Sequence, residues 1–177
     1  MIIRKAKLTD ARGIARVHVD SWRATYRNIV ADSYLDGLTY EARERLWNEN
    51  LKNDNNYVAE DENGVITGFA TGGKERTGEY ADLEGELYAI YILPEFLGRG
   101  IGQRLVERVA EDLMKQGMNS MLVWVLKDNS SRQFYEEMGG REVDSKTIRI
   151  AGKDLVEVAY GWEDLSQLIG SGQKASQ

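Results

Sequence analysis

Apolar residues near the start of the chain follow a strand pattern first and a helical pattern next. Residues 2–6 form a short apolar run that predicts a strand. After Thr9 and Asp10, which suit a helix N-terminus, apolar and aromatic side chains recur at every fourth position. This spacing places them on one stripe of a helix. The stripe consists of Ile14, His18, Trp22 and Tyr26.

Three further segments carry helical periodicity or helix caps. Residues 40–51 follow Thr39 as an N-cap, with Leu46 and Trp47 as the expected apolar anchors of that helix. Glycine ends a helix readily because it adopts the left-handed conformation. The other two segments are residues 103–116, ended by Gly117, and a short helix that Asn129 or Ser130 caps and that ends at Gly139-Gly140.

Apolar runs between turn residues predict the strands. Residues 56–60 and 65–71 flank Asn63-Gly64, which suits a hairpin turn because both residues tolerate positive φ. Residues 72–85 are polar and contain glycine, so we expect a loop there. The remaining expected strands are residues 86–93, ended by Pro94, residues 119–126, and a hairpin of residues 141–150 with 154–162 around Ala151-Gly152.

The order β-α-α-β-β-β-α-β-α-β-β predicts a mixed α/β domain. No internal repeat and no linker divides the chain, so we expect one domain over residues 1–169. Residues 165–169 add a last turn, and residues 170–177 are expected to form a disordered tail.

Composition removes several kinds of chemistry. The 177 residues contain no Cys and one His, which excludes disulfides, a thiolate nucleophile and a Cys-ligated metal, and leaves no His-rich metal site. The net charge of -6 argues against nucleic-acid binding. The start of the chain lacks the apolar core of a signal peptide, and the longest apolar run, residues 87–93, is too short for a membrane span. We expect a cytoplasmic globular protein that binds neither metal nor membrane.

Three alternate glycines between an expected strand and an expected helix form the most informative stretch. Gly98, Gly100 and Gly102 let several backbone N–H groups converge at the positive end of the helix. Such a turn binds phosphate, and Arg99 and Arg104 can pair with the same anion. A plain strand-to-helix turn is the alternative interpretation of the glycines alone.

Two other phosphate-binding motifs fail on spacing. The dinucleotide fingerprint needs a further glycine or alanine where this chain has Gln103 or Leu105. A P-loop needs Gly-Lys followed by Ser or Thr, which does not occur in the sequence.

The stretch LYAIYILPEFLGRGIG at residues 87–102 resembles the cofactor motif of the Gcn5-related N-acetyltransferase (GNAT) family. A second similar block reads VLKDN at residues 125–129 and RQFYEEMGG at residues 132–140. The resemblance implies a mostly antiparallel sheet flanked by helices, with a splayed central strand pair. It also implies acetyl-CoA as cosubstrate. Leu97 departs from the Gln or Arg usual at the first motif position.

The resemblance also implies which residues bind the cofactor. The pantetheine arm pairs with the strand before the turn, the phosphates lie on the turn, and the second block adds two contacts. Asn129 has a helix cap as its alternative role, and Arg132 a solvated helix position. The implied residues are Ile90, Tyr91, Ile92, Gly98, Arg99, Gly100, Ile101, Gly102, Gln103, Asn129 and Arg132.

Two residues are candidates for proton transfer. By resemblance, Tyr135 donates a proton to the departing CoA thiolate, and packing of its helix is the alternative role. Glu86, at the entry to the central strand, is the candidate base, and a solvated strand end is its alternative. Direct transfer needs no enzyme nucleophile, which agrees with the absence of Cys.

The acceptor is expected to be a small cationic primary amine. Trp22 and Tyr26 are the candidate substrate residues, with core packing as the alternative, and His18 is expected to be a hydrogen-bonded core histidine. Acidic residues before the central strand would favour a cation. Alternative functions are acetylation of a peptide or protein amine and a non-catalytic acyl-CoA-binding module. The resemblance also implies a homodimer. The acidic residues are Glu75, Glu79, Asp82, Glu84 and Glu86.

Overall fold

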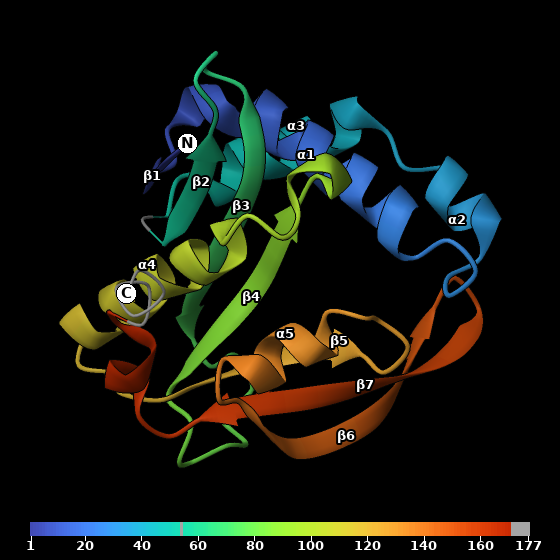
Figure 1. The fold of residues 1–177 in the computed structure, drawn as a ribbon. Helices are drawn as coiled ribbons and strands as arrows, with labels where there is room; N and C mark the ends of the chain where they lie inside the picture. Colours follow the sequence, from blue (N-terminus) through green and yellow to red (C-terminus); the bar gives the residue numbers. More distant parts are fainter. Residues whose placement is uncertain (54, 171–177) are drawn as a thin grey trace. The chain divides into compact units, whose positions relative to one another are not determined.

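The computed structural model describes residues 1–53 and 55–170 and has the expected mixed α/β fold. Its hydrogen-bonded strands follow the order β1-β2-β3-β4-β5-β7-β6. Figure 1 labels these strands together with the helices. The strands are β1 (Ile2–Lys5), β2 (Asn56–Glu60), β3 (Ile66–Lys74), β4 (Gly85–Ile92), β5 (Met121–Leu126), β6 (Arg141–Ile150) and β7 (Lys153–Trp162). The helices are α1 (Ala11–Thr25), α2 (Asp32–Asp36), α3 (Tyr40–Asn50), α4 (Ile101–Lys115) and α5 (Arg132–Glu137). Short 3-10 turns are η1 (Leu8–Asp10), η2 (Pro94–Phe96) and η3 (Leu165–Leu168).

Pairing in the sheet is mostly antiparallel, as expected for the fold class. The pairs β1–β2, β2–β3, β5–β7 and β6–β7 are antiparallel, and β4–β5 is parallel. The parallel register covers only three residues on each strand, from Gly85 opposite Met121 to Leu87 opposite Val123. Both strands continue beyond this short register.

The chain forms two compact units, which we describe separately. Unit 1 comprises Met1–Thr71 and Ala89–Leu105, and unit 2 comprises Gly72–Tyr88 and the chain from Val106 onward. Strands β3 and β4 contribute residues to both units. Of the expected tail, residues 171–177 lie outside the described part of the chain.

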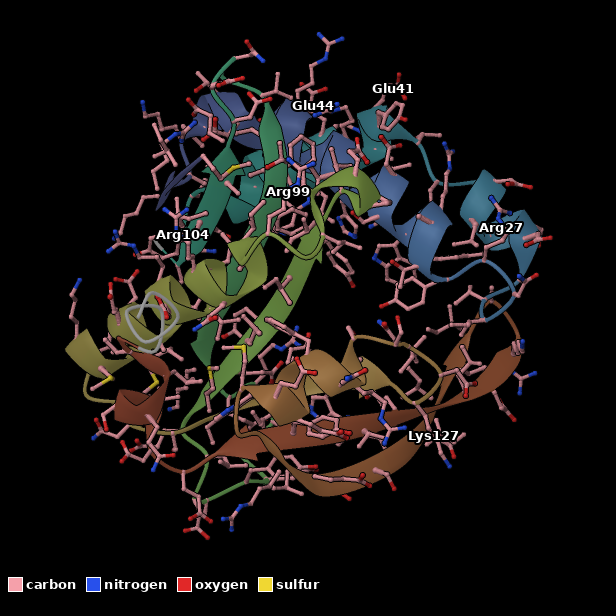
Figure 2. The ribbon with its side chains drawn as sticks, viewed as in Figure 1. Arg27, Glu41, Glu44, Arg99, Arg104 and Lys127 are labelled. Carbon is pink, nitrogen blue, oxygen red and sulfur yellow. The ribbon has the colours of Figure 1, made fainter. Side chains whose placement is uncertain are left out.

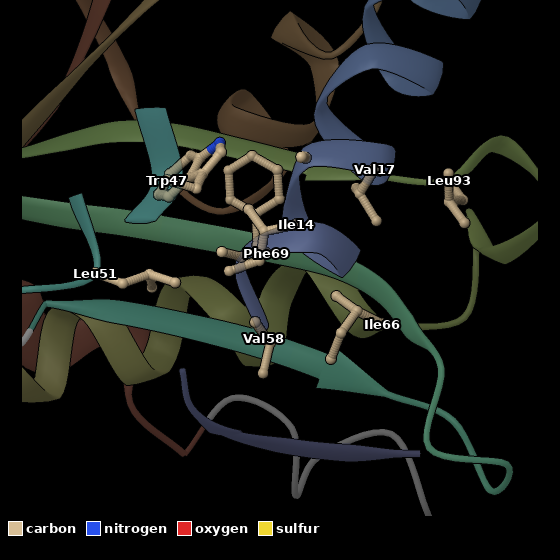
Figure 3. Close-up of a cluster of buried hydrophobic side chains, with 10 residues drawn as sticks. Ile14, Val17, Trp47, Leu51, Val58, Ile66, Phe69 and Leu93 are labelled. Carbon is tan, nitrogen blue, oxygen red and sulfur yellow. The ribbon is translucent and has the colours of Figure 1, made fainter. Parts of the chain in front are cut away.

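Unit 1 is built around an apolar core between its helices and strands β2 and β3 (Figure 3). Trp47 meets Phe69 edge to face, with ring centroids 4.9 Å apart. Helix α1 approaches the sheet closely because Gly13 has no side chain: a Cβ there would lie 2.8 Å from Ile66 Cγ1. The buried core residues are Ala11, Ile14, Ala15, Val17, Trp47, Leu51, Val58, Ile66, Phe69 and Leu93.

Unit 2 packs α5 against β7 through aromatic side chains. The ring of Tyr135 lies 6.1 Å from Tyr160 and 6.2 Å from Trp162, measured between centroids. The Trp162 indole N–H donates to the carbonyl of Met138, which fixes the end of the helix. As expected, the hairpin of β6 and β7 turns at Ala151-Gly152, and both residues have positive φ.

Several local expectations are corrected by packing. Residues 72–74 extend β3 instead of starting a loop. Glycine is required there because the strand lies close to its neighbours: a Cβ at Gly72 would be 2.5 Å from Val109 Cγ1. Leu46 is exposed, so Trp47 alone of the two expected anchors is buried. Helix α2 was not expected from the sequence.

Helix starts also differ in detail from the expected ones. Thr39 caps α3 as expected, accepting from the N–H of Ala42. Asp10 precedes α1 without capping it: its carboxylate binds Arg4 and accepts from the N–H of Lys7, which closes the capping box of η1. The N-cap of α5 is Ser131. Helix α4 begins at residue 101, two residues earlier than expected.

Candidate active site

The glycine turn of unit 1 leads directly into α4. Gly98 and Gly100 have φ values of 71° and 72°, which lie in the left-handed region that glycine readily adopts. The carbonyl of Gly100 accepts the first helical bond, from the N–H of Arg104. The first N–H groups of a helix have no intrahelical partner, so this end of α4 presents donors and the positive end of a dipole. The turn is therefore suited to an anion.

The space beside the two glycines of this turn is open. A Cβ built on Gly98 or Gly100 would meet no atom within 4 Å. Arg99 and Arg104 are exposed and add positive charge on either side of the helix start (Figure 2). Arg99 donates to the carbonyl of Glu95 and lies over the ring of Phe96, 5.0 Å from its centroid. Together, the open turn and the arginines fit the phosphates of a nucleotide-type cosubstrate.

The strand segment Ala89–Ile92 of unit 1 is anchored at its end by α1. Ser21 donates its hydroxyl to the carbonyl of Ile92 at 3.2 Å. The N–H of Leu93 donates to the carbonyl of Thr67 at 2.9 Å. Residues 90, 91 and 92 are half-buried. These bonds hold the strand against α1 and β3.

An aromatic cluster joins α1 to the same strand. Trp22 lies 4.4 Å from Tyr26, 6.1 Å from Tyr34 and 6.3 Å from Tyr91, all between ring centroids. Tyr26 is buried, whereas Trp22 and Tyr34 are half-buried. The two candidate substrate residues, Trp22 and Tyr26, therefore lie together. The indole nitrogen of Trp22 is buried and has no hydrogen-bond partner within residues 1–53 and 55–170.

His18 belongs to the same cluster and has a defined partner. Its Nδ1 accepts from the indole N–H of Trp47 at 3.1 Å. Its ring stacks on Tyr91 at 5.6 Å with an interplanar angle of 12°. Burial, with a contribution from the charge of Arg43, lowers the pKa of His18 to about 4. The imidazole is therefore neutral at physiological pH.

Glu86 of unit 2 is a buried carboxylate in an ion pair. Its side chain is 3 % exposed, while that of its partner Arg76 is 60 % exposed. Arg76 donates from Nε to Oε2 at 2.8 Å and makes a second, short bond from Nη2. The guanidinium also lies 4.5 Å from the ring centroid of Tyr88. Sequence reasoning missed Arg76, since nothing in its spacing distinguishes it from other charged loop residues.

Two other carboxylates of the expected acidic loop are bound to their own surroundings. Glu75 is buried and accepts from the N–H groups of Thr77 and Gly78 and from the Thr77 hydroxyl. Burial raises the pKa of Glu75, but these donors outweigh it and hold that pKa below its usual value. Glu84 accepts from the N–H of Asn119. These two carboxylates therefore shape the loop.

Tyr135 is buried in α5, and the residues around it form a polar network. Arg132 donates from Nε to the hydroxyl of Tyr160 at 3.0 Å and from Nη1 to the carbonyl of Lys127 at 3.1 Å. The Tyr160 hydroxyl donates to Glu136 at 2.7 Å. Arg132 thus holds α5 to β7 and to the preceding loop.

Asn129 shapes the start of this helix. Its side chain is buried and accepts from the N–H of Ser131 at 2.9 Å. Its backbone carbonyl accepts from the N–H of Arg132. Asn129 therefore forms a turn just before the N-cap residue Ser131 and is not itself the N-cap.

The described residues contain neither a metal-binding cluster nor a helix that could span a membrane. No group of three or more His, Cys, Asp or Glu side chains within residues 1–53 and 55–170 is arranged to hold a metal ion. Among the helices of that part of the chain, none has the length and apolar character needed to cross a membrane.

Comparison with known proteins places the chain in a family. A family model described as FR47-like protein matches residues 76–150. The uncharacterized N-acetyltransferase YuaI of Bacillus subtilis is 44% identical over 94% of this chain and 95% of its own length. The spermidine N(1)-acetyltransferase of Thermoplasma acidophilum is 24% identical over 81% of this chain and 89% of its own length.

A solved structure shares the fold. The yncA protein of Salmonella typhimurium, solved with its cofactor acetyl-CoA, superposes with a TM-score of 0.64 at 23% identity. The match covers 93% of this chain and 94% of that protein. Together with the extended similarity to YuaI, the fold and the glycine turn show that this chain belongs to the Gcn5-related N-acetyltransferase family of acetyl-CoA-dependent enzymes.

Proposed function

We propose that the chain transfers the acetyl group of acetyl-CoA directly to the nitrogen of a small cationic primary amine. The observation that carries the proposal is the open turn at Gly98 and Gly100 before α4, flanked by Arg99 and Arg104. Bound acetyl-CoA supplies an activated thioester. The turn holds its phosphates through backbone N–H groups, so an acidic chain needs no basic surface to bind it.

Strand β4 positions the reactive end of the cosubstrate in this proposal. The N–H groups of Ile90 and Ile92, which alternate with that of Tyr91 along the strand, pair with the pantetheine arm and face the thioester. Hydrogen-bond donors at that place stabilise negative charge on the carbonyl oxygen. Ser21 supports the arrangement by bonding the carbonyl of Ile92, which limits movement of the strand end.

Tyr135 and Glu86 handle protons. The Tyr135 phenol protonates the leaving sulfur, and Glu86 takes a proton from the amine through a water molecule. The ion pair with Arg76 limits how Glu86 can accept a proton, because the Arg76 guanidinium occupies one oxygen of the carboxylate. Oxygen Oε1 then receives the proton. It accepts a long 3.5 Å bond from the backbone N–H of Arg76.

Trp22 and Tyr26 line the acceptor site in this proposal. Aromatic faces attract a cationic amine, and each such contact contributes about 0.5–2 kcal/mol. The spermidine specificity in the name of the Thermoplasma relative supports a small cationic acceptor. Asn129, Arg132 and the turn residues Ile101, Gly102 and Gln103 complete the proposed cofactor contacts.

Release of CoA, measured over a panel of amines, tests the proposal. The panel contains polyamines, amino sugars, amino-acid amides and short peptides with a free N-terminus. Turnover of the small amines, with peptides much slower, supports it. Preference for peptides indicates a peptide N-acetyltransferase instead. Tight acetyl-CoA binding with no turnover on any amine indicates a non-catalytic acyl-CoA-binding module.

A further inference from the structure

His18 is the single histidine of the chain, and its two ring nitrogens have different roles. Nδ1 accepts from the Trp47 indole N–H. A neutral imidazole carries one proton, so acceptance at Nδ1 places that proton on Nε2. Stacking on Tyr91 and edge contact with Trp47 fix the plane of the ring. His18 is therefore an oriented N–H donor of known tautomer.

Within residues 1–53 and 55–170, His18 makes a single hydrogen bond, the one that its Nδ1 accepts from Trp47. The Nε2–H of His18 therefore has no acceptor in that part of the chain. One turn further along α1, the Trp22 indole N–H is also without an acceptor in that part of the chain, and it is buried. The two rings lie 6.2 Å apart between centroids. A buried donor such as the Trp22 N–H destabilises the fold when it has no acceptor, and native proteins keep few of them.

The surroundings of His18 favour an oxygen atom of a ligand over a cationic group. The rings that pack around it are Trp22, Trp47, Phe69 and Tyr91, which supply no carboxylate. The charge that acts on His18 is that of Arg43, and it is positive. An N–H donor near a positive charge attracts a carbonyl or carboxylate oxygen and repels an ammonium group.

We infer that the Nε2–H of His18 binds a carbonyl or carboxylate oxygen of the acceptor, so the acceptor is an amino-acid-type amine. This inference rests on the proposed function, because it places the acceptor beside Trp22. The amine nitrogen lies toward the aromatic faces of Trp22 and Tyr26, and the oxygen toward His18. His18 is a specificity residue that transfers no proton.

Two substitutions test the Nε2–H donor of His18 separately from the contact of Nδ1 with Trp47. In His18→Asn the amide reaches the position of Nδ1 and can accept from Trp47, but it has no donor at the position of Nε2. In His18→Gln the amide nitrogen reaches the position of Nε2 and restores a donor there. A purely structural role predicts that Asn is the better replacement, whereas the recognition role predicts Gln.

The kinetic test uses two amines of similar shape, L-alaninamide and 3-methyl-2-butylamine, of which only the first has a carbonyl oxygen. The ratio of their kcat/KM values is measured in each protein, so the difference in amine basicity cancels between variants. We expect wild type to favour alaninamide, the ratio to fall on the order of tenfold in His18→Asn, and His18→Gln to retain most of it. The inference is overturned if the ratio in His18→Asn equals that of wild type. It is also overturned if His18→Asn changes only the affinity for acetyl-CoA.

Binding provides a second readout that does not need turnover. The chain has one imidazole, so both ring ¹⁵N resonances belong to His18, and the protonated Nε2 is distinguished from the unprotonated Nδ1 by its chemical shift. With CoA present, alaninamide should shift the Nε2 resonance and 3-methyl-2-butylamine should not. No shift with alaninamide overturns the inference. Turnover of polyamines without this shift leaves the proposed function standing and removes only the role of His18.

Discussion

Arg76 lies over the carboxylate of Glu86, so the candidate base is buried beneath a surface guanidinium. Burial alone penalises a charged carboxylate, and the partner offsets that penalty. The same contact occupies Oε2, while Oε1 accepts a long 3.5 Å bond from the Arg76 backbone N–H. The pair thus allows two roles for Glu86, as a proton acceptor and as the anchor of the loop that carries Arg76.

Replacing Glu86 with Gln distinguishes these roles. The amide keeps the shape of the side chain but accepts no proton, so we expect kcat to fall by about 10²-fold or more while acetyl-CoA affinity stays unchanged. Steady-state kinetics and cofactor titration measure both. Glu84→Gln is the matched control, because Glu84 bonds the N–H of Asn119 and has no proposed part in the chemistry. Wild-type turnover in Glu86→Gln would leave Glu86 as a loop anchor only.

Removing the Tyr135 hydroxyl tests the proposed proton donor. Tyr135→Phe keeps the ring contacts with Tyr160 and Trp162, so we expect a folded protein. Turnover should fall by about 10–10²-fold with little change in the Kd for acetyl-CoA. Tyr80→Phe serves as the control, since it loses a phenol that bonds Asp144. If both variants turn over like wild type, Tyr135 packs α5 and donates no proton.

A side chain at Gly100 tests the turn. Gly100→Asp places a carboxylate where the phosphates are proposed to bind, and we expect acetyl-CoA binding to be lost. Gly64→Asp is a matched control for backbone strain, because Gly64 has a φ of 78° and open space around its Cβ in the β2–β3 hairpin. Isothermal titration with acetyl-CoA measures affinity, and thermal unfolding measures folding. Retained affinity in Gly100→Asp contradicts the role of the turn.

The lowered pKa of His18 predicts a pH dependence of stability. The unfolded chain binds a proton at His18 near the ordinary value of 6.5, whereas the folded chain resists protonation until about 4. The free energy of unfolding therefore falls as pH drops through this window, by about 3 kcal/mol at most from this group. Above the window the effect is absent.

Urea unfolding of wild type and His18→Gln, from about pH 7 to about pH 4, isolates this effect from that of the carboxylates. The difference between the two proteins should shift against wild type as the pH falls. A constant difference across the window would show that His18 titrates alike in the folded and unfolded chain.

Local signals in the sequence predicted most elements of the fold. The hairpin at Gly64, the cap at Thr39 and the stop at Gly117 depend on hydrogen bonds and dihedral angles within a few residues. Such interactions are the same whatever the rest of the chain does. The glycine turn is local in the same sense, which is why its motif pointed to the family before any contact was known.

Packing decided what local signals could not. Gly72 looked like a loop residue, but it lies in β3, at a point where Val109 of α4 approaches too closely for any residue with a Cβ. Leu46 and Trp47 have similar apolar character in the sequence, and only the position of the sheet determines which of them is buried.

By itself, the sequence determined the order of the elements apart from α2, the mixed α/β class and the candidate phosphate turn, because each of these depends on neighbouring residues. Only the tertiary structure placed Arg76 on Glu86 and Trp47 on His18. The second pair joins residues 29 positions apart in the sequence. No periodicity or motif records such a contact, since it exists only when two helices have packed. That contact determines the tautomer of His18 and therefore which nitrogen is available to a ligand.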